Sequence, residues 1–244
     1  MIRDDAYAAL HTVSDPELDE PITDLGFVRS LDASPDGRVT VHLRLPTSFC
    51  SPNFAYLMAS DAKDALTALP QVREVEVLLD DHHDSDLINA GLAADAGYRG
   101  TFGEEAESSL DELRLTFRRK AHTAAMERAL TQLLRREREL EEADLHAVTL
   151  GDLPDERTTH ALLRRREALG LGTGPDEAVM VDDQGRPYPR EEVPLRLRLA
   201  RSTRISIDGN AHFCRGLLRT RYPDSANDQA PRAEGAENLK ESSA

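Results

Sequence analysis

A strand that turns directly into a helix, with a cysteine at the corner, is the feature that most constrains this sequence. Apolar residues alternate with polar ones over residues 39–45, which is the period-two pattern of a half-buried strand. Pro46 ends that strand, and Ser51 and Pro52 are residue types favoured at the cap and in the first turn of a helix. Cys50 is therefore expected just before a helix N-terminus, where the helix dipole favours a thiolate over a thiol.

Two interpretations of Cys50 stay open. A thiolate at this corner suits metal or sulfur chemistry, but free cysteines are also among the most buried residues of protein cores. The only other cysteine is Cys214, so the chain has neither a disulfide framework nor a C-x-x-C pair. One subunit cannot supply the four thiolates usual for a stable iron–sulfur cluster, so any cluster would be bridged, transient or partly held by other atoms.

Length and charge limit the class of protein. A chain of 244 residues can bury one good core or two modest ones. The net charge of −15 opposes nonspecific binding to nucleic acid or to anionic lipid. The sequence contains no apolar run long enough to span a bilayer and no apolar signal segment near its start, so we expect a cytoplasmic protein without nucleic-acid or membrane partners.

The fold class expected from the pattern is α+β. Helices and strands alternate over the first 80 residues, and a tight turn at residues 34–37 joins two of the strands into a hairpin. The expected elements are a helix at 4–13, strands at 27–31 and 38–45, a helix at 52–69 and a strand at 72–79. This order predicts a small N-terminal domain, residues 1–103, with helices packed on a three-stranded sheet.

Two acidic motifs precede the hairpin, Asp15-Pro16-Glu17-Leu18 and Asp24-Leu25-Gly26. Asp15 and Glu17 are candidate ligands, but Asp15 can also form a turn with its own backbone and Glu17 can sit in the turn after the proline. Asp24 is expected to be structural, because Gly26 can supply a backbone conformation that other residues avoid.

The arrangement resembles the PaaD/SufT-like family of iron–sulfur and metal-centre assembly factors over residues 3–80. The segments that carry the resemblance, in agreeing order and spacing, are the two acidic motifs, Thr47-x-x-Cys50-Ser51 and Leu69-Pro70-x-Val72-x-x-Val75. The resemblance implies a maturation factor that is not an enzyme, in which Cys50, Asp15 and Glu17 are the functional residues. We expect Cys50 to hold iron or an iron–sulfur cluster transiently, with Asp15 and Glu17 as additional cofactor-binding ligands or as docking charges. Phe49 stands where many relatives carry Gly or His, and Cys50-Ser51-Pro52 replaces the commoner Cys-Pro.

A second group of metal-binding residue types lies at residues 80–86, Asp-Asp-His-His-Asp-Ser-Asp. Iron(II) accepts mixed imidazole and carboxylate ligands, so His82, His83 and Asp84 are candidate metal ligands together with Cys50. Alternatively, Asp84 or Ser85 caps a helix at 86–94 and the other charges are solvated. Residues 97–103 are expected to form a glycine-rich connector.

The rest of the chain predicts a mainly helical extension at residues 104–222 and a disordered tail at 223–244. Its expected elements are one long or bent helix at 108–142, a helix at 156–169 and a small hairpin at 179–188. Residues 191–207 alternate like a strand but have a helix-forming composition, and a helix at 191–202 is the favoured interpretation. His122 is expected to be structural. His212 and Cys214 would share a face only on an extended segment, and a buried position is the favoured interpretation of Cys214.

We therefore expect a maturation factor that assists iron or iron–sulfur centre assembly in a client metalloenzyme, with other assembly proteins as further partners. By analogy with family members, the expected client is a non-haem iron monooxygenase. A homodimer would bring two Cys50 thiolates together. The alternative is an adaptor that binds no metal and in which Cys50 only packs. A metal-dependent hydrolase at residues 80–86 ranks below both, because no nucleophile and base accompany that segment.

Overall fold

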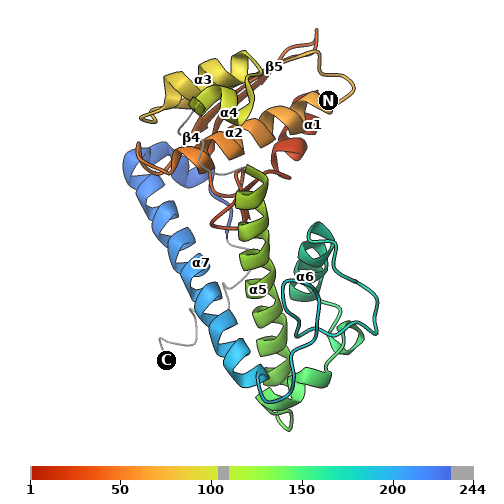
Figure 1. Ribbon diagram of the computed structural model, residues 1–244. Coiled ribbons are helices and arrows are strands. Elements are labelled where there is room, and N and C mark those ends of the chain that lie inside the picture. Colours follow the sequence, from red (N-terminus) through yellow and green to blue (C-terminus); the bar gives the residue numbers. More distant parts are fainter. Residues whose placement is uncertain (1, 104–109, 232–244) are drawn as a thin grey trace. The chain divides into compact units, whose positions relative to one another are not determined.

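The computed structural model describes residues 2–103 and 110–231, which form two compact units (Figure 1). One unit contains the described residues up to Leu113 together with those from Asn210 onward, and the other is Arg114–Gly209. This division differs from the expected one, in which residues 104–222 formed a single consecutive extension. Residues 210–231 belong to the N-terminal unit.

The first unit is α+β, as predicted. Strand β4 pairs with β3 in antiparallel and with β5 in parallel, so the sheet order is β3-β4-β5. A separate two-stranded ladder joins β1 to β2. The elements are α1 (Ile2–Leu10), β1 (Ser14–Asp15), β2 (Glu20–Pro21), β3 (Val28–Ala33), β4 (Arg38–Arg44), α2 (Pro52–Thr67), β5 (Glu74–Asp80), α3 (Ser85–Ala93) and α4 (Gly97–Phe102).

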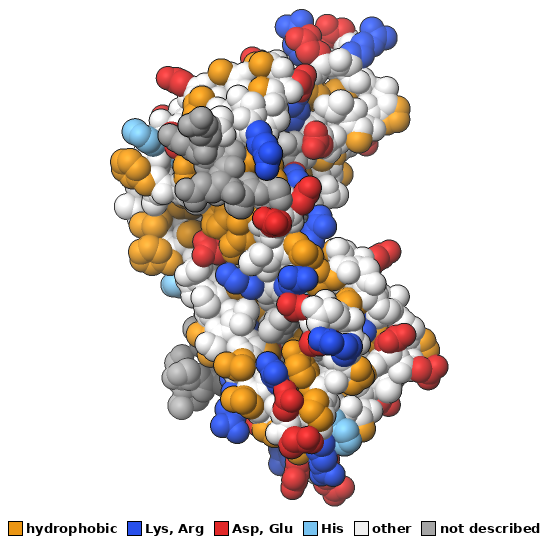
Figure 2. Space-filling view, viewed as in Figure 1, with side chains coloured by type: hydrophobic (Ala, Val, Ile, Leu, Met, Phe, Trp, Pro, Cys, Tyr) orange, Lys and Arg blue, Asp and Glu red, His pale blue; other side chains and the backbone are white. Residues whose placement is uncertain are grey.

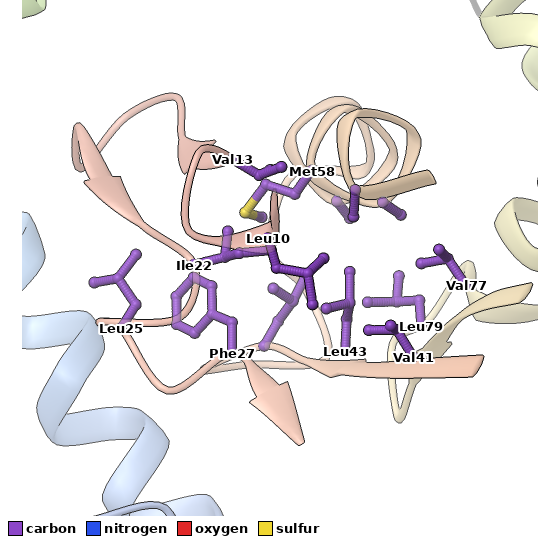
Figure 3. Packing of buried hydrophobic residues seen from close by; sticks show 14 of the residues in the cluster. Leu10, Val13, Ile22, Leu25, Phe27, Val41, Leu43, Met58, Val77 and Leu79 are labelled. Carbon is purple, nitrogen blue, oxygen red and sulfur yellow. The ribbon is translucent and has the colours of Figure 1, made fainter. Parts of the chain in front are cut away.

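The core of this unit lies between the sheet and helices α1 and α2 (Figure 3). Alternate residues of β4, Val39, Val41 and Leu43, are buried, which follows from the pleat of a strand with one face on the core. The last part of a long helix, α7 (Val193–Arg221), adds Ala211 and Leu218 to the same core. The N-terminal domain is therefore completed by residues that lie more than 100 positions away in sequence.

The hairpin turn predicted at residues 34–37 is present. The amide of Gly37 donates to the carbonyl of Ser34 at 3.1 Å, and Gly37 has a φ of +91°. A Cβ at this position would lie 2.7 Å from the carbonyl oxygen of Gln71, so only glycine fits without a backbone shift.

Residues 97–102 form helix α4, so the expectation of a glycine-rich connector at 97–103 is wrong. Tyr98 and Phe102 are one helical turn apart, and their rings lie 5.5 and 5.7 Å from the ring of Tyr56 on α2. Thr101 packs so closely on Gly91 that a Cβ there would meet it at 2.0 Å. These tertiary contacts outweigh the low helix propensity of Gly97 and Gly100 within α4.

The second unit is helical. It contains the main part of α5 (Leu110–Arg136), η2 (Glu142–Ala147), η3 (Leu150–Asp152), α6 (Arg157–Ala168) and the first part of α7. Helix α5 ends before the expected limit of 142, and the expected start at 108–109 lies outside the described residues. The expected hairpin at 179–188 is reduced to one bridge, Val181 to Pro187, around a turn.

Helix α7 extends far beyond the expected end at residue 202. In the second unit its buried positions, Val193, Leu197 and Ala200, follow a helical period, whereas Leu195 and Leu199 are exposed. Glu127 of α5 is fully buried and accepts from Arg201 at 3.1 Å and from Arg204, one turn later on α7. This charge pairing requires the helical spacing of the two arginines.

The expectation of a disordered tail from residue 223 is wrong for its first part. Residues Pro223–Asn227 form the short helix η4, and Asp224 and Asp228 both accept from the buried guanidinium of Arg44 on β4. The guanidinium carbon of Arg44 also lies over the ring of Tyr222, 5.4 Å from the ring centre. Residues 232–244 lie outside the described part of the chain.

Charged side chains of both signs are interspersed over the face shown in Figure 2. Among the residues described, no helix is both long and apolar enough to cross a membrane.

Candidate functional site

Cys50 lies in the loop between β4 and α2, two residues before the first residue of that helix. Its thiol is half-buried and lies 3.4 Å from the Thr47 hydroxyl. Ser51 occupies the N-cap position but makes no side-chain cap hydrogen bond, and Pro52 begins the helix, where its missing N–H has no cost. The loop tip, Phe49, is 80% exposed. This geometry leaves one side of the Cys50 loop open to a partner.

His82 fastens the Cys50 loop to the end of β5. The backbone N–H of Asp84 donates to Nδ1 of His82 at 3.0 Å, so Nε2 carries the proton and donates to the carbonyl oxygen of Cys50 at 2.8 Å. Both ring nitrogens of this buried imidazole are thus engaged. A metal could bind His82 only if one of these hydrogen bonds were given up, and the predicted role of His82 as a ligand stays a prediction.

His83 and Asp84 lie next to the same loop. The amide of His83 donates to the Ser48 carbonyl at 2.9 Å, and the exposed His83 ring lies 5.7 Å from the ring of Phe49. Asp84 occupies the N-cap position of α3 without a side-chain cap hydrogen bond. Their predicted metal-ligand roles also stay predictions.

The acidic motif combines the turn geometry and the electrostatics expected of a buried carboxylate. Oδ1 of Asp15 accepts from the amides of Glu17 and Leu18 at 2.9 and 2.8 Å, which is the local turn foreseen from the sequence. Burial nevertheless raises the pKa of Asp15 to about 6, because desolvation of the charged form outweighs these two hydrogen bonds. Glu17 is half-buried, and its Oε1 accepts from the side-chain amide of Asn210 on α7 at 3.2 Å.

The end of α7 brings a residue that sequence reasoning did not place in the site. Cys214 is half-buried, and its pKa is raised to about 12 by burial and then by the negative charges of Asp15, Cys50 and Glu17. The two cysteines, 164 positions apart in sequence, pack against one hydrophobic core. The sequence alone does not place Cys214 in the site. Ala211 and Leu218 flank it at helical spacing and face the core, but this pattern is informative only when the segment is known to be a helix.

The Asn210–Glu17 contact thus holds the Cys214 segment of α7 against the acidic motif, and His82 holds the Cys50 loop. Among residues 2–103 and 110–231, no three His, Cys, Asp or Glu side chains are arranged so that they could hold one metal ion. The donor types fit a thiophilic metal or cluster, but the set is incomplete, so any metal bound here would keep coordination positions open to a second protein.

The first unit is a small α+β domain with a half-buried cysteine at a strand-to-helix corner. A family model described as iron-sulfur cluster assembly protein matches residues 3–79 of this unit. The chain is 34% identical over 82 residues to MJ1129, an uncharacterized protein of Methanocaldococcus jannaschii, with coverage of 34% of this chain and 84% of that protein.

Two further relatives carry descriptive names. The Fe-S protein maturation auxiliary factor YitW of Bacillus subtilis is 33% identical over 76 residues, which are 31% of this chain and 72% of YitW. The iron-sulfur cluster carrier protein of Mycobacterium leprae is 40% identical over 72 residues, which are 30% of this chain and only 18% of that protein. The chain belongs to the iron-sulfur cluster assembly protein family through its N-terminal third.

Proposed function

We propose that this protein is a maturation factor that receives iron or an iron–sulfur unit as cargo at Cys50 and passes it to a client metalloenzyme. The single observation that carries the proposal is the position of the Cys50 thiol, half-buried in the loop between a strand and a helix, within a domain of the iron-sulfur cluster assembly protein family. The names of YitW and of the mycobacterial carrier support the same class of role.

In this proposal the Cys50 thiolate holds the cargo, and Asp15 and Glu17 supply negative charge beside it. Carboxylates favour a metal cation, and the Asp15 carboxylate is held in place by two backbone amides. The incomplete donor set suits cargo that must be released as well as bound. The role of His82, His83 and Asp84 as additional ligands belongs to the same proposal, although His82 already holds the loop.

The helical unit, Arg114–Gly209, is proposed to recognise the client, because the family match ends at residue 79. A non-haem iron monooxygenase stays the predicted client. The alternative function, an adaptor that carries no metal, is favoured by one observation: Cys50 packs against the hydrophobic core of its unit, as a purely structural cysteine would.

Anaerobic reconstitution separates the two functions. Wild type, Cys50→Ala and the matched loop control Ser51→Ala would each be incubated with Fe²⁺, with and without sulfide, and freed of unbound ions. Bound iron, acid-labile sulfide and the visible spectrum would then be measured. Ser51 is exposed and makes no side-chain cap hydrogen bond, so its truncation tests the loop without the thiol.

The carrier function predicts that wild type and Ser51→Ala retain iron or a cluster and that Cys50→Ala loses it. The ratio of iron to sulfide identifies the cargo. Equal retention by Cys50→Ala and wild type, or no retention by either, would overturn carriage at Cys50 and favour the adaptor.

A further inference from the structure

The last three turns of α7 make hydrogen bonds and an ion pair with the acidic segment of residues 17–24. Asn210 donates to Glu17 at 3.2 Å, and Arg215 pairs with Glu20 and donates to the carbonyl of Asp24 at 3.1 Å. These contacts anchor α7 to the acidic motif by two residues that lie on either side of Cys214.

The same helix is also anchored to the Cys50 loop. The guanidinium of Arg221 donates to the carbonyl of Leu45 at 3.1 Å and to the Ser48 hydroxyl at 2.7 Å, and it also contacts the carbonyl of Asp81. The Cys50 loop is therefore held by two residues from distant parts of the chain, Arg221 on α7 and His82 after β5. The blue end of α7 and the start of α2 can be followed in Figure 1.

Cys214 lies on the face of α7 that makes these contacts. Asn210 is one helical turn before it on the same face, and Ala211 and Leu218, which flank it at helical spacing, are fully buried in the core of this unit. Cys50 and Cys214 both pack against that core. The contacts of Asn210, Arg215 and Arg221 therefore turn the face of α7 that carries Cys214 toward the acidic motif and the Cys50 loop. In agreement, Asp15, Cys50 and Glu17 all contribute to the electrostatic environment of Cys214.

We propose that Cys214 is a second thiol of the Cys50 site, so that the two cysteines bind one thiophilic divalent metal ion between them. The inference rests on the proposed function, since it names a second protein ligand for the same cargo. A cation between these groups neutralises charges that otherwise repel one another, and soft thiolates select metals such as iron, zinc and cadmium. Water or a donor from the recipient would complete the coordination.

The first test asks whether both thiols can bind one atom, without using iron. Phenylarsine oxide condenses with two thiols: two As–S bonds form, the arsenic–oxygen bond breaks, and the two thiol protons leave with that oxygen as water. Arsenic and sulfur keep their oxidation states. We expect one arsenical per wild-type chain, resistant to excess monothiol and released by a dithiol, as read by native mass spectrometry.

The second test counts the thiolates on a metal. Cadmium(II) added to the reduced protein gives ultraviolet thiolate-to-metal charge-transfer absorbance that rises with the number of thiolates bound. We expect Cys214→Ala to lower this absorbance to about half and to weaken cadmium binding by roughly tenfold or more, since loss of even an outer partner of a metal ligand costs about 10–100-fold. Cys214→Ser is a second variant that keeps the size of the side chain.

The matched control is His212→Ala, which removes an exposed potential ligand two residues away on another face of α7 and should leave both readouts unchanged. Monothiol-labile arsenical binding by wild type, or cadmium absorbance equal in wild type and both Cys214 variants, would overturn the thiol pair.

Failure of this inference is distinguishable from failure of the proposed function. If iron is retained through Cys50 but no arsenical bridge forms, the thiol pair is wrong and carriage at Cys50 stands. If the bridge forms and cadmium reports two thiolates, but neither iron nor a cluster is retained, the thiol pair stands and the proposed cargo is wrong.

Discussion

Asp15 shows how one buried side chain can oppose the stability of the fold that positions it. Its side chain is only 7% exposed, and burial raises its pKa from 3.8 to about 6. The folded state therefore binds more protons than the unfolded state between about pH 4 and pH 6, so the free energy of unfolding falls as the pH rises through this window. At neutral pH the charged carboxylate is a cost that a purely structural residue would not need.

Asp15→Asn is expected to raise the free energy of unfolding at pH 7 by up to about 3 kcal/mol, at 1.36 kcal/mol per pKa unit. The asparagine oxygen can still accept from the amides of Glu17 and Leu18, so the turn is kept while the buried charge is removed. Urea unfolding followed by circular dichroism between pH 4 and pH 8 measures the effect. A variant less stable than wild type at pH 7 would contradict it.

His122 of α5 has the opposite effect on the pH dependence of stability, because burial lowers its pKa instead of raising it. Its imidazole is 2% exposed, and burial together with the positive charges of Arg166 and Arg165 lowers its pKa from 6.5 to about 4. The unfolded state binds more protons between about pH 4 and pH 6.5, so the stability due to neutral His122 is present above that window and is lost as the pH falls through it.

In wild type, protonation of His122 is expected to lower the free energy of unfolding by up to about 3 kcal/mol between pH 7 and pH 4, and His122→Leu should abolish this decrease. In wild type the contributions of Asp15 and His122 to the pH dependence partly cancel. In Asp15→Asn the free energy of unfolding is therefore expected to fall more steeply on acidification, and in His122→Leu it is expected to rise. The same pH series of unfolding curves tests this, and a profile of His122→Leu that overlays wild type would refute it.

At the scale of elements, the last turns of α7 contribute side chains to the core of the N-terminal unit. Leu218 is fully buried in that core, and its Cδ2 lies 3.4 Å from where a Cβ on Gly26 would stand. Leu218→Ala is expected to lower the free energy of unfolding by about 2–4 kcal/mol, as large-to-small core changes do. The matched control, Leu217→Ala on the same helix, removes a partly exposed side chain and should cost clearly less. Equal losses in denaturant unfolding would show that α7 does not pack as described.

The elements that the sequence predicts well are those set by local pattern. The alternation at 39–45, the turn at Gly37 and the amphipathic helix after Pro52 are all decided within about ten residues. The α+β class and the position of Cys50 at the corner follow from them. Asp15 forms the predicted turn for the same reason, since its partners are two and three residues away.

The parts that could not be predicted depend on distant partners. Leu195, Leu197 and Leu199 alternate like a strand, but only Leu197 is buried, and the charge pairing of Glu127 with Arg201 and Arg204 decides for a helix. The long reach of α7 then carries Cys214 to the core of the N-terminal unit, against which Cys50 also packs. No local signal at residues 210–214 specifies which other segment that face contacts.

At the scale of the whole molecule, the N-terminal unit is discontinuous in sequence, because its residues up to 113 are completed by those from 210 onward. The family model matches residues 3–79, within the first of these two stretches, whereas the fully buried Ala211 and Leu218 and the carboxylates that pair with Arg44 come from the second. The side chain of Arg44 is 1% exposed, so removal of that cover leaves an apolar surface and an unpaired cation at the end of β4.

A chain that ends at Gly209 is therefore expected to lose stability in its N-terminal unit, on the order of 3 kcal/mol or more, from the lost core side chains and the uncovered arginine. A chain that ends at Pro231 keeps every contact described for this unit and is the control. Hydrogen exchange of the amides in β3, β4 and β5, read by mass spectrometry, measures the effect strand by strand. If the shorter chain were protected as strongly as the control, the strands of the N-terminal unit would not depend on the last turns of α7.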